Sequence, residues 1–425
     1  MSTWPVVIVT GANAGVGFGV CRRLLFQLCL ANPPDSQPQS WANHSDDGLG
    51  SVDALRADGL TLIMACRSTQ RAETARKELY QELDAHIARL RTRADYDGHA
   101  DVFRRNLKIE VERLDLAELS SVFTFAAQIS DRYSYISHLV CNAGVASFHH
   151  IDWPACLKQV ATNFLSAITG PEFYVQSVGE VSVDGLGWIW QSNLFGHYVL
   201  FRALEPLLKN SAYSADSRII WSSSLEASPK FYQNEDWQLV KTEHSYESVK
   251  YEIDLLGTIL DHRALADTSS AKRVRHFVSH PGVCSTKISN NLVPYGGILD
   301  NLKILLFYFG RMLGSRHHSI FPDNAAIAIT HLILVSLSFV TFAASPKKKT
   351  ATNGSVDGNG HVSHLDPQTP VRFGAETDRW GHAEVGLTPV KGWKENEVQG
   401  ELLLERCDAL YREFSAKRKT SGIDS

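Results

Sequence analysis

The chain has 425 residues, of which 44% are hydrophobic and 21% are charged, which is ordinary for a globular protein. Its net charge of −4 and isoelectric point of about 6.5 argue against nucleic acid as a partner. The seven cysteines are scattered and form no C-x-x-C pair, which excludes a disulfide framework and indicates a reducing compartment. The chain enters an apolar run directly after Pro5, so we predict no secretory signal, and we predict no metal site.

The first predicted element is a buried strand at Val6 to Val9, which runs into the glycine-rich stretch Thr10 to Gly17 and an amphipathic helix. This order predicts a nucleotide site, because glycines permit a tight turn and the helix N-terminus offers free N–H groups to a pyrophosphate. A glycine-rich turn without a ligand is the alternative. The residues of the turn that we expect to bind the nucleotide are Gly11, Asn13, Ala14, Gly15, Val16 and Gly17.

Residues 31–59 are rich in proline, serine and acidic residues, and we predict a polar surface insertion there. A second strand follows at Leu60 to Ala65 and ends at Cys66 and Arg67. In NAD sites this strand end carries an acid for the ribose 2′-hydroxyl, whereas a basic residue suits a 2′-phosphate. Arg67 therefore predicts NADPH as the cofactor; the alternative is an exposed arginine at the start of a helix.

Three further strands reach the same predicted sheet edge, where open α/β sheets bind ligands. A strand near Ile109 leads to Asp115 and Leu116, in the position of an adenine pocket. A strand at Ile136 to Val140 ends in Asn142-Ala143-Gly144, whose small residues let the backbone approach a cofactor. A strand at Val274 to Val278 ends in the stretch 280–286.

The stretch Tyr246 to Lys250 places a tyrosine and a lysine on one face of a predicted helix. A phenol has an ordinary pKa near 10, and a nearby cation lowers that pKa toward the range useful for proton transfer. On its own this pairing is a common coincidence. Upstream, a strand at Arg218 to Trp221 ends in Ser222-Ser223-Ser224, whose hydroxyls either hydrogen-bond a carbonyl oxygen or cap the turn.

Five segments do not fit a minimal nucleotide-binding domain. Residues 145–190 are rich in large apolar groups and form either a helix pair packed on the core or an apolar wall for a substrate or membrane. Residues 287–320 contain an apolar stripe with basic flanks, typical of an interfacial helix or of a flap that covers the substrate. Residues 325–344 are long enough to span a membrane, but we favour a core helix that covers the sheet. Residues 346–370 predict a disordered low-complexity loop, and residues 371–425 a last strand and helix.

Taken together, these motifs fall in the order found in short-chain dehydrogenases/reductases, and the resemblance covers roughly residues 5 to 290. It implies one Rossmann-type α/β domain over residues 1–425, with a doubly wound parallel sheet and helices on both faces. Further stretches resemble the fungal 3-ketosteroid reductases of sterol C-4 demethylation. The motifs that carry the first resemblance are Thr10-Gly11-x-x-x-Gly15-x-Gly17, Asn142-Ala143-Gly144, Asn193, Ser224, Tyr246-x-x-x-Lys250 and Pro281-Gly282; those that carry the second are Cys66-Arg67, 193–197, 220–224, 280–286 and 376–381.

The resemblance implies a role for each catalytic residue. Tyr246 protonates the ketone oxygen, Lys250 holds the nicotinamide ribose and lowers the phenol pKa, and Asn193 supports a water-linked proton path to Lys250. Ser224 hydrogen-bonds the carbonyl; it is chosen over its two neighbours because the family's serine usually closes the strand-end pair. The long spacing from Ser224 to Tyr246 departs from most of the family but resembles this branch. The residues implied to bind NADPH beyond the glycine turn are Arg67, Asp115, Leu116, Asn142, Ala143, Gly144, Tyr246, Lys250, Pro281, Gly282, Val283, Ser285 and Thr286.

The implied activity is reduction of the 3-keto group of a 4-methyl sterol intermediate in ergosterol biosynthesis. Two alternatives stay open: reduction of another lipophilic carbonyl, such as a 17-ketosteroid or retinal, and a scaffold for the enzymes of sterol C-4 demethylation. The same resemblance implies work at the cytosolic face of the endoplasmic reticulum or on lipid droplets, a complex with other enzymes of that pathway, and a homodimer.

Overall fold

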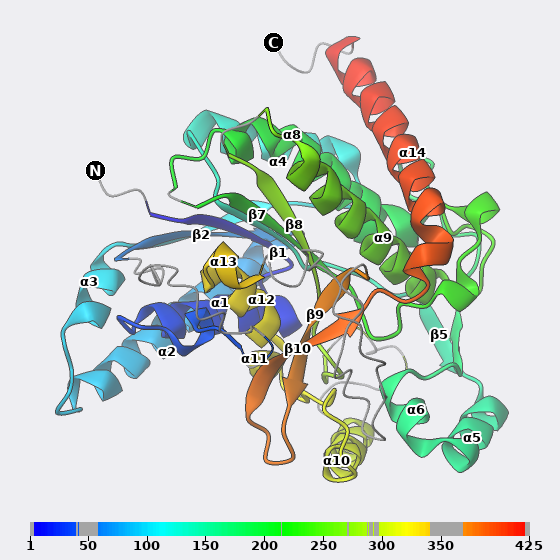
Figure 1. The fold of residues 1–425 in the computed structure, drawn as a ribbon, viewed down its shortest axis with the longest axis horizontal. Coiled ribbons are helices and arrows are strands. Elements are labelled where there is room, and N and C mark those ends of the chain that lie inside the picture. Colours follow the sequence, from blue (N-terminus) through cyan, green and yellow to red (C-terminus); the bar gives the residue numbers. More distant parts are fainter. Residues whose placement is uncertain are drawn as a thin grey trace, which may run out of the picture.

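The computed structural model describes residues 4–39, 41, 58–213, 215–269, 272–286, 288, 292, 297–340 and 369–420. At its centre is an eight-stranded sheet with the order β10-β9-β8-β7-β4-β1-β2-β3 (Figure 1). All neighbours are parallel except β9 and β10, which form an antiparallel hairpin. The strands are β1 (Val6–Thr10), β2 (Leu60–Cys66), β3 (Leu107–Arg113), β4 (His138–Cys141), β7 (Ser217–Ser222), β8 (Val274–His280), β9 (Val371–Thr377) and β10 (Ala383–Pro389).

The order of the first six strands is that of a dinucleotide-binding sheet, which confirms the predicted fold class. Strand β1 lies in the middle, the chain moves outward through β2 and β3, and it then returns to β4 on the other side. Where the direction of winding reverses, the connections after β1 and β4 leave on opposite faces and open a crevice at the carboxyl ends of the strands. This crevice is where the sheet positions the functional site.

Helices cover both faces of the sheet, and alternate strand residues feed two separate cores. In β1, Val6 and Ile8 join the core on one face, whereas Val7 and Val9 join the core on the other. Figure 1 shows α4, α8, α9 and α14 on the first face and α1, α2 and α12 on the second. These helices are α1 (Gly15–Leu28), α2 (Thr69–Arg91), α4 (Leu119–Arg132), α8 (Gly196–Lys209), α9 (Ser245–Ala266), α12 (Ile327–Leu334) and α14 (Trp393–Thr420).

The expected core helix within residues 325–344 is confirmed for its described part. Every residue of α12 is buried, and the short helices α11 (Pro322–Ala325) and α13 (Leu337–Val340) flank it. Within the described ranges, no helix combines the length and the apolar character that a membrane span needs. The predicted disordered loop at 346–370 lies outside the described residues, apart from 369 and 370.

The predicted surface insertion at 31–59 is partly wrong, because its first residues are packed. The carboxylate of Asp35 is buried and pairs with Arg23 of α1, and the ring of His331 in α12 lies 2.7 Å from the Asp35 carbonyl oxygen. A short 3-10 turn, Pro34–Ser36, holds this contact. Residues 40 and 42–57 of the insertion lie outside the described part of the chain.

The apolar insertion 145–190 forms a small separate lobe rather than a core-packed helix pair. Its strands β5 (Phe148–Ile151) and β6 (Tyr174–Gln176) pair with each other, and α5 (Trp153–Thr162) and α6 (Phe164–Thr169) connect them. No residue of α5 is buried, so packing on the core is wrong for this helix. The lobe's other end returns to the core through the three-residue helix α7 (Trp188–Trp190).

The C-terminal region adds one strand that the sequence pattern did not predict. A single last strand was expected, but β9 pairs with β8 and then turns back as β10. Two further helices complete the described structure: α3 (His99–Arg105) beside α2, and α10 (Ile298–Met312) at the edge of the molecule near α6.

Candidate active site

The glycine turn after β1 has a backbone that only glycines accommodate. Gly11 and Gly15 have φ angles of +66° and +56°, in the left-handed region. A Cβ at Gly17 would lie 2.4 Å from the carbonyl oxygen of Gly11 and 2.5 Å from the side-chain nitrogen of Asn142. The three glycines therefore let β1, α1 and the turn after β4 approach one another more closely than any larger residue permits.

The start of α1 fits the pyrophosphate of a dinucleotide. The residue that precedes the helix, Ala14, offers no side-chain acceptor to the helix N–H groups, and the first turn holds no acidic residue. Thr286 lies beside Gly15, where the notional Cβ of that glycine would be 3.7 Å from the threonine side chain. The turn residues and Thr286 thus meet as predicted, and an anion placed there would find free backbone donors.

The predicted 2′-phosphate position is also available. Arg67 follows β2 with an exposed side chain, and Arg71 is exposed on the first turn of α2. On the adenine side, Leu116 is buried and Asp115 accepts a hydrogen bond from the Ala117 N–H. These residues fit NADP at the carboxyl edge of β2 and β3, where the sequence placed them.

The segment after β8 is held in place by a parallel stretch of backbone. Gly282 has a φ of +68°, and Val283 and Ser285 donate backbone hydrogen bonds to the carbonyls of His317 and Ile320. The Ser285 hydroxyl donates to Asp300. Of the residues predicted here, Thr286 reaches the glycine turn, whereas Val283 and Ser285 are committed to these structural contacts.

Tyr246 and Ser224 are brought together by β7 and α9. The Ser224 hydroxyl accepts a hydrogen bond from the Glu226 N–H and lowers the pKa of the Tyr246 phenol, although 22 positions separate the two residues along the chain. The other two serines of the cluster are turned elsewhere: the Ser223 hydroxyl donates to the Lys250 carbonyl, and the Ser222 hydroxyl is buried without a partner among the described residues. Ser224 is therefore the serine of the three whose hydroxyl reaches Tyr246.

Lys250 and Asn193 meet on the other side of the tyrosine, against Gly144. The ammonium of Lys250 lies 5.7 Å from the Tyr246 ring centre and donates to the carbonyl of Ser222. Asn193 sits in a short π-helix, residues Gln191–Phe195, and its side chain exchanges two hydrogen bonds with the backbone of Val145. The notional Cβ of Gly144 would lie 2.7 Å from the Asn193 side-chain oxygen and 3.7 Å from the Lys250 nitrogen. All four predicted catalytic residues thus converge on one volume.

The predicted lowering of the tyrosine pKa is wrong for this structure. Burial raises the pKa of Tyr246 above its ordinary value, the carboxyl group of Glu226 raises it further, and the hydrogen bond from Ser224 only partly offsets this. Burial also lowers the pKa of Lys250 to about 8, and its ammonium is directed at a backbone carbonyl rather than at the phenol. The prediction counted the cation but could not include desolvation or Glu226.

Glu226 is a member of the site that sequence reasoning missed. One of its carboxyl oxygens is buried without a hydrogen-bond partner among the described residues. Burial and, to a smaller extent, the nearby Glu247 raise the pKa of Glu226 to about 8, against the opposing effect of Lys250. Its position two residues after Ser224 was the available signal, but an acid in a loop of 22 residues is ordinary.

Two long-range contacts place the catalytic groups. The side-chain oxygen of Gln176 in β6 accepts hydrogen bonds from the Tyr246 N–H and the Ser245 hydroxyl. Gln176 thereby caps the start of α9. From β9, the buried Arg372 donates to the Ser224 carbonyl at 3.1 Å and to Asp254 of α9 at 2.9 Å. The sequence offered no signal for either contact, because both partners lie far away along the chain.

Thr10 and His197 connect the glycine turn to the Asn193 helix. The Thr10 hydroxyl accepts hydrogen bonds from the N–H groups of Asn142 and Ala143, and it lies 2.9 Å from His197 Nε2. The other ring nitrogen of His197 lies 3.0 Å from the Asn193 carbonyl oxygen. A carbonyl only accepts, so Nδ1 carries the hydrogen and Nε2 accepts from Thr10. Burial lowers the pKa of His197 to about 4, which keeps the ring neutral.

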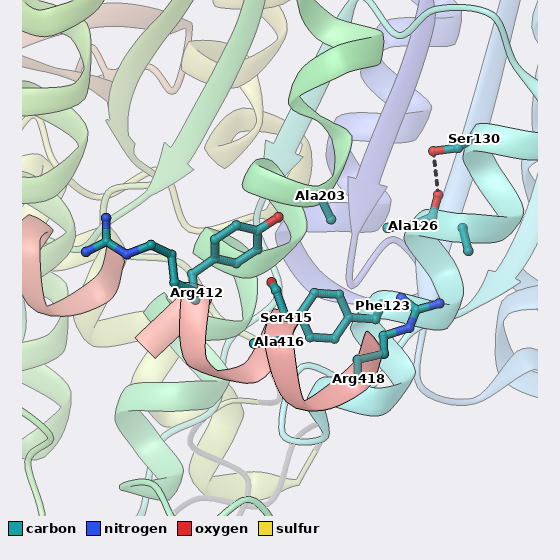
Figure 2. Close-up of a pocket in the computed structure, with 10 residues that line it drawn as sticks. Phe123, Ala126, Ser130, Ala203, Arg412, Ser415, Ala416 and Arg418 are labelled. Carbon is teal, nitrogen blue, oxygen red and sulfur yellow. Dashed lines mark hydrogen bonds between the residues drawn. The ribbon is translucent and has the colours of Figure 1, made fainter. Parts of the chain in front are cut away.

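A separate cavity lies away from these residues. It has a volume of about 590 Å³ and is formed by α4, α8 and the last turns of α14 (Figure 2). Figure 2 shows Arg418 reaching over the ring of Phe123, and the two groups are 5.4 Å apart. None of the predicted site residues lines this cavity, so it is not the site described above.

The sheet order, the glycine turn and the Ser224–Tyr246–Lys250 cluster define a short-chain dehydrogenase/reductase. No family model matches the chain. The chain is similar to the 3-keto-steroid reductase of Schizosaccharomyces pombe, with 27% identity over 98% of this chain and 99% of that protein. It is similar to the Saccharomyces cerevisiae 3-keto-steroid reductase, with 34% identity over 62% of this chain and 72% of that protein. A solved 3-oxoacyl-[acyl-carrier protein] reductase from Brucella melitensis is 16% identical, with a TM-score of 0.47 over 80% of this chain and 94% of that chain. The chain belongs to the 3-keto-steroid reductase family.

Proposed function

We propose that the protein uses NADPH to reduce the 3-keto group of a 4-methyl sterol intermediate to the 3-hydroxyl, as a step of sterol biosynthesis. The observation that carries this is the convergence of Tyr246, Lys250 and Asn193 at Gly144, with the Ser224 hydroxyl close enough to act on the Tyr246 phenol. Two converging O–H donors are what a ketone oxygen needs as it gains charge during reduction. The steroid as substrate is supported by the names of the relatives.

NADPH, when bound, supplies the hydride that adds to carbon 3 of the ketone. The Tyr246 hydroxyl gives its proton to the ketone oxygen, and the Ser224 hydroxyl donates a hydrogen bond to the same oxygen. The raised pKa of Tyr246 keeps the phenol protonated, which is the form that a reduction consumes. The phenolate left behind is stabilised by Ser224 and the positive charge of Lys250, and the role proposed for Asn193 is to support proton return through Lys250.

The proposed place of action is the cytosolic face of the endoplasmic reticulum or the lipid droplet surface, where a sterol ketone is dissolved. Support comes from the many apolar side chains that α5, α6 and α10 leave exposed. A complex with other enzymes of sterol C-4 demethylation and a homodimer stay predictions.

The test is turnover of a detergent-dispersed 4-methyl-3-ketosterol, followed as NADPH consumption and as formation of the 3-hydroxysterol. Tyr246→Phe removes the proton donor and is expected to abolish turnover. Tyr251→Phe is the matched control: it lies on the same helix, loses a hydrogen bond to the Gly392 carbonyl, and is expected to stay active. Turnover that survives Tyr246→Phe would refute the mechanism. Preference for retinal or a 17-ketosteroid in a parallel panel would refute the substrate.

A further inference from the structure

Helix α10 places its charged residues inward and its apolar residues outward. Asp300 and Arg311 are 2% and 5% exposed. Asp300 accepts a hydrogen bond from Ser285 and pairs with Lys303 at 2.6 Å, and Arg311 donates to the His318 carbonyl at 2.7 Å. These contacts show that the side of α10 that carries Asp300 and Arg311 is the covered side. The opposite side of the helix is exposed and mostly apolar. The exposed large apolar residues of α10 are Ile298, Leu299, Leu302, Leu305, Leu306, Tyr308, Phe309 and Met312.

Five of these residues form one stripe. Ile298, Leu302, Leu305, Phe309 and Met312 follow one another at alternating steps of four and three, which is the spacing of a single helix face. Ile298 is 88% exposed and Met312 is 71% exposed, so the stripe faces outward along the whole helix. A helix on the surface of a soluble domain normally has the opposite polarity, with its apolar stripe on the core. The stripe therefore indicates an apolar environment outside the molecule.

The apolar surface continues onto two neighbouring parts of the chain. The ring of Phe309 packs edge-on against Phe164 of α6 at 5.6 Å, and α5 adds its own exposed apolar residues. At the same end of α10, the turn between β9 and β10 meets Arg311 through Gly381 and carries Trp380, which is 85% exposed. Figure 1 shows α5, α6, α10 and this turn along one edge of the molecule. The exposed residues of α5 and α6 are Trp153, Leu157, Val160 and Leu165.

Strands β5 and β6 connect this surface to the active site. The strands β5 and β6, which carry α5 and α6, place Phe148 and Tyr174 against each other with their ring centres 5.0 Å apart. Phe148 in turn packs edge-on against Tyr246, with a ring separation of 5.5 Å. A row of aromatic contacts thus leads from β6 through β5 to the proton donor.

We propose that α10, α5, α6 and the β9–β10 turn form a lipid-docking surface that lies flat in the interfacial layer of one membrane leaflet, and that the ketone passes from the lipid to Tyr246 along β5 and β6. The docking follows from the surface alone, whereas the route rests on the proposed function. A 15-residue helix is about 22 Å long, too short to cross a bilayer but suited to lying in its plane. Trp153 on α5 and Trp380 on the β9–β10 turn are both exposed on this surface, and tryptophan prefers the membrane–water interface.

The experiment is flotation of the full chain with vesicles of phosphatidylcholine and phosphatidylethanolamine. The double variant Leu302→Glu/Leu305→Glu places two charges on the stripe. The matched control, Val183→Glu/Val398→Glu, places two charges at exposed valines outside this surface. We expect the wild type and the control to float, also at high salt because the contact is apolar. We expect the stripe variant to partition at least about tenfold more weakly.

Turnover is measured with the ketone dispersed in detergent and with the ketone dissolved in vesicles. The comparison distinguishes an effect on membrane docking from an effect on the catalytic step. With detergent-dispersed ketone, the stripe variant is expected to keep its rate within about twofold, because the changed side chains lie on the outer surface. With ketone supplied in vesicles, its rate is expected to fall together with its partition. Wild-type protein that does not float, or a stripe variant that floats equally well, would overturn the proposal. A dimer that the stripe variant converts to monomer, without flotation of either, would show a second copy on this surface instead. Protein that floats but reduces no ketone would refute the proposed function and leave the docking intact.

Discussion

His197 provides the sharpest test of how the site is assembled, because its two ring nitrogens have different partners. Nδ1 donates to the Asn193 carbonyl and Nε2 accepts from the Thr10 hydroxyl. Asparagine at this position can keep a donor near the place of Nδ1, and glutamine can keep an acceptor near the place of Nε2. His197→Asn thus keeps the bond to Asn193 and removes the bond to Thr10, and His197→Gln does the reverse. His197→Phe removes both bonds and keeps an aromatic ring at this position.

The expected loss of folding free energy depends on which hydrogen-bond partners remain for Thr10 and for Asn193. Without Nε2, the Thr10 hydroxyl can turn to the Val140 carbonyl oxygen, which lies 3.2 Å away, so that bond is largely replaced. Without Nδ1, the Asn193 carbonyl loses a partner in a buried position, at a cost of about 1–3 kcal/mol. His197→Phe is therefore expected to lower the free energy of unfolding by about 2–3 kcal/mol. His197→Asn should lose about 1 kcal/mol or less.

The assay pairs urea unfolding with NADPH binding followed by cofactor fluorescence. We expect His197→Gln to disturb the Asn193 helix and lower kcat, with NADPH affinity nearly unchanged. We expect His197→Asn to weaken NADPH binding, because the replacement bond to the Val140 carbonyl is longer, 3.2 Å against 2.9 Å, and leaves the Thr10 hydroxyl less firmly placed beside Asn142 and Ala143. Equal effects of the two variants on kcat and on NADPH affinity would refute this division of roles.

Three further predictions concern other parts of the site. Arg67→Glu should weaken kcat/KM with NADPH by at least about tenfold and leave the value with NADH unchanged; an equal loss with both cofactors would contradict the assigned 2′-phosphate contact. Arg372→Met should lower the free energy of unfolding by about 3–5 kcal/mol, because it leaves Asp254 buried and unpaired, and adding Asp254→Leu should restore most of the loss in the same urea experiment. Glu226 ionises near 4.5 in the unfolded chain and near 8 in the folded protein, among Glu247, Lys250 and Tyr246, so wild-type stability is lost as pH rises through that window. Glu226→Gln should remove this loss in thermal unfolding at a series of pH values; a constant difference from the wild type would contradict the raised pKa.

The sequence was sufficient for the sheet and for the residues that surround the cofactor position. Short apolar runs that end in glycine, asparagine or serine show where buried parallel strands end, and in a doubly wound sheet those ends meet at one edge. Tyr246, Lys250, Ser224 and Asn193 therefore converge as predicted, although they come from three different elements. Local patterns pointed to the Tyr246–Lys250 pair and the serine cluster, whereas the roles of Asn193 and Ser224 came from the resemblance to the family.

What the sequence could not provide is the balance of long-range electrostatics. The pKa of Tyr246 depends on burial and on Glu226, and both depend on how the loop after β7 packs. Arg372 reaches Ser224 and Asp254 only because β9 joins the sheet beside β8, a pairing that spans about 90 residues of chain. A buried arginine in a terminal strand has no local signature, since its partners are set by tertiary structure.

For helix α10 as well, the sequence alone could not predict the surroundings of the residues. Hydrophobic periodicity identifies which residues share a helix face, but it does not say whether that face meets protein or lipid. The segment 287–320 left both readings open, as a flap over the substrate or as an interfacial helix. The inward positions of Asp300 and Arg311, with their partners, show which side is covered and thereby which side is not. The two charges therefore carry more information about which side of the helix is covered than its apolar residues do.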